Sequence, residues 1–207
     1  MHASNRAASA AEFAAGYSET DRQRIDFAWN GKHASEFLDT NQQFRWEVVA
    51  HCISEPGKAS PLLLEHLFLA DAAWSKEAWA APRHFGALAA TLLQRGGEAS
   101  LKVFTSGLGA SFDTFGACHQ MTQLSPELAA RLATAARELS SKAEDEKVKG
   151  QLQVSAELFE KIQKGTASQG WATVKPGTPV QNVRVVWPRW YHKLWARLAA
   201  WVKNRAT

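Results

Sequence analysis

Cysteine and long apolar runs are scarce in this sequence, and each scarcity excludes a class of protein. Only two of the 207 residues are cysteine, Cys52 and Cys118, which excludes a disulfide scaffold and favours a reducing, cytoplasmic location. No apolar run approaches the roughly 20 residues that span a bilayer. The stretch from Met1 to Tyr17 is rich in Ala and Ser without a continuous apolar segment, so we expect no secretory signal there.

The residues that are abundant predict a folded, helical protein. The chain is 45% hydrophobic and 21% charged, which is enough apolar material to bury a core. Strand patterns are weak before about residue 165, whereas Ala, Leu, Glu and Lys dominate, so this region is predicted to be helical. The expected helices cover about 20–38, 41–54, 61–72, 75–80, 82–95, 98–107, 126–141 and 144–164.

Capping residues and composition divide the chain into four parts. Ser60-Pro61 and Ser125-Pro126 each pair an N-cap residue with proline at the first helical position. After Gly165 helical periodicity gives way to Gly, Pro, Thr and Val. We therefore expect a flexible N-terminal arm at 1–18, a helical domain at 19–164, an extended strap at 165–186 and an amphipathic helix at 187–207.

The helical segments repeat weakly. Segments 46–53, 86–93 and 126–133 align at a spacing of 40 residues, with an alanine at the same position in each. Gly57 and Gly97 mark equivalent turns in the first two units. Over residues 41–164 this helix–turn–helix layout resembles HEAT or armadillo repeats. The resemblance implies an all-α, solenoid-like stack of antiparallel helical hairpins; the alternative is an irregular helical bundle.

Charge is divided between an acidic body and a basic tail. Residues 1–161 contain 16 Lys and Arg against 20 Asp and Glu, whereas residues 162–207 contain eight basic residues and no acidic one. A mildly acidic body argues against a nucleic-acid surface and favours a basic protein partner. The acidic candidates for that contact, expected on outer helix faces, are Glu65, Asp71, Glu77 and Glu98.

The tail is the most distinctive segment. From Pro188 to about Asn204 aromatic and Leu residues share one helical face, with Arg and Lys mostly on the other. This composition is typical of a helix that lies on an anionic membrane surface. It also suits a capping helix packed on the body, or a recognition element for a protein. The candidate contact residues are Trp187, Trp190, Tyr191, Lys193, Trp195, Arg197 and Trp201.

Sequence patterns that indicate a catalytic or metal site are weaker than the pattern of the tail. Two adjacent pairs, His51-Cys52 and Cys118-His119, could in principle supply four zinc ligands, but neighbouring residues on a helix point about 100° apart. We expect both cysteines to be buried apolar side chains instead. The 106–119 linker could supply a nucleophile and a base from Cys118 and His119. We expect it instead to be a loop whose Phe112 and Phe115 side chains are buried in the core. Nucleotide, hydrolase and metalloprotease motifs are absent, and no cofactor is expected.

These features favour a binding protein over an enzyme. Stacked helical hairpins present a long surface and rarely hold catalytic residues. A bacterial adaptor, a secretion chaperone or a toxin-immunity protein would fit the shape and charge. Two alternatives remain open: a peripheral membrane protein attached by its tail, and an enzyme or metal protein that uses His51, Cys118 and His119.

Overall fold

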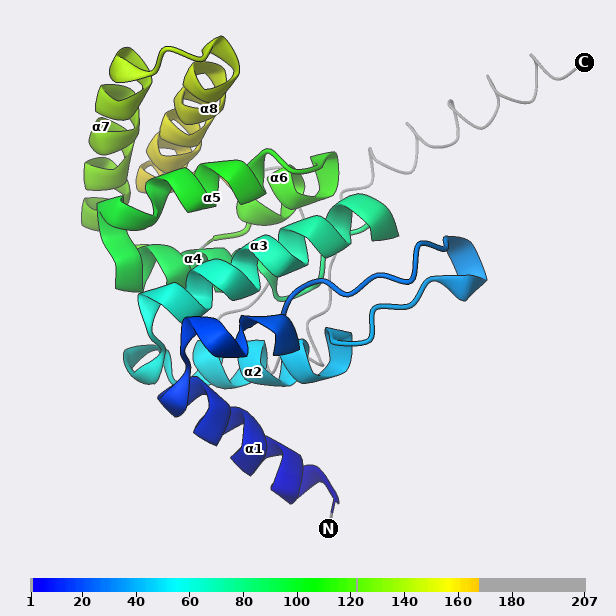
Figure 1. Ribbon diagram of the computed structural model, residues 1–207. Helices are drawn as coiled ribbons and strands as arrows, with labels where there is room; N and C mark the ends of the chain where they lie inside the picture. Colours follow the sequence, from blue (N-terminus) through cyan, green and yellow to red (C-terminus); the bar gives the residue numbers. More distant parts are fainter. Residues whose placement is uncertain (1, 122, 168–207) are drawn as a thin grey trace, which may run out of the picture.

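The computed structural model describes residues 2–121 and 123–167, with side chains from Ser9 onward, and this part of the chain is all-α (Figure 1). Its helices are α1 (His2–Gly16), α2 (Gln42–Ser54), α3 (Pro61–Ala78), α4 (Phe85–Gly96), α5 (Leu101–Leu108), α6 (Phe112–Cys118), α7 (Pro126–Lys142) and α8 (Glu146–Gln163). Four short 3-10 helices lie between them: η1 (Glu19–Arg24), η2 (Ala34–Glu36), η3 (Pro56–Lys58) and η4 (Gly97–Ser100).

Several helix starts are where the capping residues predicted them. The hydroxyl of Ser60 accepts a hydrogen bond from the backbone N–H of Leu63 at 3.2 Å, and Ser125 does the same for Leu128. Each hydroxyl supplies an acceptor for a backbone N–H of the first helical turn, which has no partner within the helix. The proline that follows the serine has no N–H and needs no acceptor. Asp145 caps α8 in the same way, accepting from two backbone N–H groups.

A row of phenylalanines joins four helices in the core. Phe68 of α3 stacks on Phe85 of α4, with ring centroids 4.7 Å apart, and on Phe104 of α5 at 6.0 Å. Phe104 in turn contacts Phe159 of α8 at 5.2 Å. All four side chains are fully buried, so this row carries a large share of the apolar area removed from water.

Three sets of consecutive helices begin about 40 residues apart in the sequence, namely α2 with α3, α4 with α5, and α7 with α8, although α3 packs more extensively against α4 and α5 than against α2. Gly57 lies in η3 and Gly97 in η4, so the first two pairs have the turn that their glycines predicted. α7 and α8 lie side by side as a hairpin, and α6 is an additional short helix between the second and third pairs (Figure 1). The all-α class is confirmed, whereas the solenoid-like stack and the irregular bundle both stay predictions.

The structure differs from the prediction at the N-terminus. Residues 2–16 form a helix where a flexible arm was expected, and α1 packs against α2. The ring of Phe13 lies 5.1 Å from Phe44, and the Tyr17 hydroxyl lies 2.5 Å from Nδ1 of His66. Small residues such as Ala10 and Ala14 are buried at this contact, so alanine here allows close packing.

Three further local predictions are wrong. The expected helices over 61–72 and 75–80 are one continuous helix, α3. The expected helix over 20–38 is replaced by η1 and a loop, in which Gly31 has a φ of +77° and an isolated bridge pairs Trp29 with Asp39. The expected 106–119 loop contains α6, and Phe112 is 65% exposed and does not plug the core. Phe115 is half-buried and packs against the core as expected.

The strap and the basic amphipathic helix, with all seven candidate residues of the tail, lie outside the described residues apart from 165–167. Among the helices that are described, none combines the length and apolar character needed to cross a bilayer.

Candidate interaction surface

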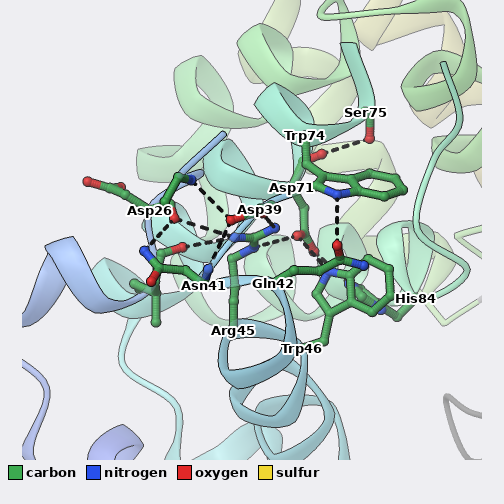
Figure 2. A network of polar contacts seen from close by, with 12 residues as sticks. Asp26, Asp39, Asn41, Gln42, Arg45, Trp46, Asp71, Trp74, Ser75 and His84 are labelled. Carbon is green, nitrogen blue, oxygen red and sulfur yellow. Dashed lines mark hydrogen bonds and ion pairs between the residues drawn. The ribbon is translucent and has the colours of Figure 1, made fainter. Parts of the chain in front are cut away.

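A buried network of charges joins α2, α3 and the start of α4 (Figure 2). Arg45 donates from Nε to Oδ1 of Asp71 at 2.8 Å and from Nη2 to Oδ2 of Asp39 at 2.7 Å. His84 donates from Nε2 to the second oxygen of Asp71 at 2.6 Å. The side chains of Asp39, Arg45 and Asp71 have no exposed surface, and that of His84 is 2% exposed.

These pairings explain how the interior tolerates charge. Burial opposes ionisation of Asp71, but His84 and Arg45 together hold the pKa of its carboxyl below the ordinary value. Trp46 adds a hydrogen bond from its indole Nε1 to Asp71 Oδ1 at 3.1 Å. A buried ion pair is a weak source of net stability but strongly favours one geometry, because removing either member leaves an uncompensated charge.

The same network fixes the loop that precedes α2. Asp39 Oδ1 accepts from the backbone N–H groups of Ala28 and Asn41, each at 3.1 Å. The Asn41 amide donates to the carbonyl oxygens of Gln23 and Asp26, each at 2.9 Å. These bonds hold the two ends of the loop together. Residues 28–39 project from the body beside the C-terminal end of α3 (Figure 1).

Aromatic side chains line the contact between this loop and the helices. We call the set the aromatic face: Phe27, Trp29, Phe37, Trp46 and Trp74. Successive rings are in contact, from Phe27–Trp29 at 6.2 Å and Trp29–Phe37 at 6.3 Å to Phe37–Trp74 at 6.0 Å and Trp74–Trp46 at 5.4 Å. All five side chains are half-buried, so each ring also meets solvent.

Trp79 lies just beyond the same end of α3 and is 84% exposed, the largest value among the big apolar side chains described. Its φ of +55° is a left-handed conformation, which is uncommon for a residue other than glycine. Trp79 is the C-cap of α3, so this backbone geometry ends the helix. Leu38, in the projecting loop, is 54% exposed.

The four acidic candidates do not form one surface. Asp71 is fully buried in the network, so its expected place on an outer face is wrong. Glu65 is half-buried and accepts from Ser100 at 2.6 Å, whereas Glu98 is exposed. Glu77 is half-buried at the other end of α3 from Glu65, about 18 Å along the helix at 1.5 Å per residue.

The candidate metal ligands remain apart. In the described residues no group of three or more His, Cys, Asp or Glu side chains is placed to hold a metal ion. Both cysteines are free and buried. His51 lies 3.6 Å from Glu55, and His119 Nδ1 lies 2.9 Å from the Phe115 carbonyl oxygen. Burial, together with Lys161, lowers the pKa of His119 below the ordinary value.

Comparison with known proteins gives no guide to the role of this surface, because no family model, curated protein or solved structure matches the chain.

Reasoning from the sequence missed the aromatic face. The five aromatic residues from Phe27 to Trp46 are a usable signal, but the local pattern predicts helices over 20–38 and 41–54 and so separates them. Trp74 joins them only through the tertiary fold, since it lies 37 residues beyond Phe37 in the sequence.

Proposed function

We propose that this protein binds another protein through its aromatic face and the adjoining Trp79. The observation that carries the proposal is the 84% exposure of Trp79, which ends α3 five residues after Trp74, a member of a continuous set of half-buried aromatic rings. Trp and Tyr dominate binding hot spots because they bury a large area while losing few rotatable bonds. An exposed indole at the end of a helix therefore has the chemistry of an anchor.

The buried network supports this role by making the surface rigid. Asp39 and Asn41 hold the base of the projecting loop, while Trp46 and Trp74 are each oriented by an indole hydrogen bond, to Asp71 and to Gln42. A surface already ordered in the free protein loses less conformational entropy on association. Adaptor, secretion-chaperone and immunity functions would all use such a surface.

Site-specific photo-crosslinking in the source cells tests the proposal. A photoreactive phenylalanine analogue replaces Trp79 in the full chain, and a matched variant carries it at Leu62, which is 41% exposed. Leu62 lies about 25 Å away along α3, at 1.5 Å per residue. We expect a discrete adduct to another protein from position 79 and none from position 62.

A second variant checks that the face itself is responsible. Trp29→Ala removes a ring from the aromatic face and should reduce the adduct formed at position 79. The same adduct from both positions, or an adduct that Trp29→Ala leaves unchanged, would contradict binding through this face.

A further inference from the structure

A groove elsewhere on the molecule shares no lining residue with the aromatic face. It lies between the end of α5, α6 and the first half of α8, and has a volume of about 440 Å³. Leu108, Phe115 and Val154 contribute apolar walls, and Gln151 and Lys147 contribute polar ones. Val154 is 39% exposed, so the apolar wall is open to water.

Gly150 contributes no side chain to the α8 side of the groove. Glycine is unfavourable inside a helix, yet this one lies in the second turn of α8 and lines the groove. A Cβ built at Gly150 would meet no atom within 4 Å, so packing inside the described body does not require glycine here. The missing side chain leaves space for something that enters the groove from outside.

The carboxylates near the groove favour a basic occupant. Glu146 and Lys147 line the groove, and residues 144–149 together hold three carboxylates and two ammonium groups, of which that of Lys149 pairs with Glu146 at 3.2 Å. Residues 168–207 contain seven basic residues and no acidic one. Their aromatic and Leu residues are also the chemistry that an apolar groove accepts.

The length of the chain allows this segment to reach the groove. The described part ends at Ala167, which is buried and whose N–H donates to the Lys161 carbonyl oxygen at 3.2 Å. Gln151 lies about 20 Å back along α8 from Lys164, at 1.5 Å per residue. Residues 168–186 can span up to about 60 Å when extended, so a segment that begins at Trp187 can reach the groove.

We propose that the groove between α5, α6 and α8 is the docking site for residues 187–202 of the same chain. The apolar face that contains Trp195 and Leu198 enters beside Gly150, and the basic residues lie toward the carboxylates of residues 144–146. Docking there covers Val154 and Phe115. The basic tail then lies against the acidic body, and covering its apolar face does not require a membrane.

Zero-length carbodiimide crosslinking of the full chain, read by mass spectrometry, tests the docking. At low protein concentration and without lipid, we expect amide bonds from Glu144, Asp145 or Glu146 to Lys193 or Lys203. Links formed only between two copies, which a mixture of isotopically labelled and unlabelled protein reveals, would overturn the proposal. So would the absence of links between the tail and residues 144–146.

A groove-filling variant makes the test specific. Gly150→Leu places a side chain in the groove and should lower the docked fraction, and with it the yield of these links, at least about tenfold. Val148→Leu is the matched control, because Val148 is exposed on α8 about 160° around the helix from Gly150. Equal yields from the two variants would overturn the proposal.

A variant in the tail guards against a failure of Gly150→Leu to fold. Leu198→Asp leaves the described body untouched and should reduce the links to the same extent. If it does not reduce them, or if the unmodified chain gives no links and instead floats with anionic vesicles, the tail is a membrane-binding segment and the proposal fails.

Discussion

Arg45 of α2 and Asp71 of α3 form an ion pair in the interior, with Arg45 Nε 2.8 Å from Asp71 Oδ1 and neither side chain exposed. The residues are 26 positions apart in the sequence. Their contact connects the loop that bears Trp29 and Phe37 with α3, which bears Trp74 and ends at Trp79. The shape of the aromatic face therefore depends on a charge pair beneath it.

Replacing Asp71 should strongly destabilise the protein. Asp71→Asn keeps the size of the side chain but leaves Arg45 and His84 without their shared counter-charge, and breaking a buried pair costs about 3–5 kcal/mol of unfolding free energy. Asp26→Asn is the control, since Asp26 pairs with Arg22 at a 45% exposed side chain and should cost less than about 1 kcal/mol. Urea unfolding followed by circular dichroism measures both; equal losses would contradict the buried network.

Acid should weaken the protein through the same carboxyl. The pKa of Asp71 is lower in the folded chain than in the unfolded chain, where an aspartate titrates near pH 3.9. Its contribution is therefore complete above that value and is lost as the pH falls toward the folded pKa. Urea unfolding between about pH 6 and pH 3 should show a steeper fall in stability for the natural chain than for Asp71→Asn. Parallel curves would show that Asp71 does not carry this effect.

Two glycines should respond oppositely to alanine. Gly107 lies against Phe68, and a Cβ there would overlap the buried ring, so Gly107→Ala should cost about 1–3 kcal/mol. Gly150→Ala meets open space inside a helix and should stabilise by about 0.5–1 kcal/mol. Thermal unfolding of the two variants beside the natural chain separates them; a gain for Gly107→Ala would mean that the contact between α3 and α5 is looser than described.

The two cysteines should be inert in the folded protein. Burial raises the pKa of the Cys52 thiol to about 12 and also raises that of Cys118, so at pH 8 almost no reactive thiolate is present. A chromogenic disulfide reagent should label neither thiol in native buffer and both in urea. Rapid labelling of Cys118 in native buffer would instead support the enzyme alternative for Cys118 and His119.

Local patterns predicted the elements that depend on neighbouring residues. The starts of α3 and α7 follow from Ser-Pro pairs, because an N-cap hydroxyl and a proline act within one turn. Asp71 could also have been recognised as buried, since it shares a helical face with Leu64, Leu67 and Phe68. Its prediction as an outer-face residue relied on its charge and not on its position in the apolar pattern of the helix.

The sequence by itself therefore determined the helical class, most helix boundaries and the separation of an acidic body from a basic tail, because these depend on short-range periodicity, caps and composition. Only the tertiary structure decided that α1 packs on α2, that residues 25–41 form a loop and that distant aromatic residues share one face. Each of these depends on contacts between residues far apart in the sequence, such as Arg45 with Asp71 and Phe37 with Trp74. No local pattern encodes such partners, since burial and charge compensation are properties of the assembled fold.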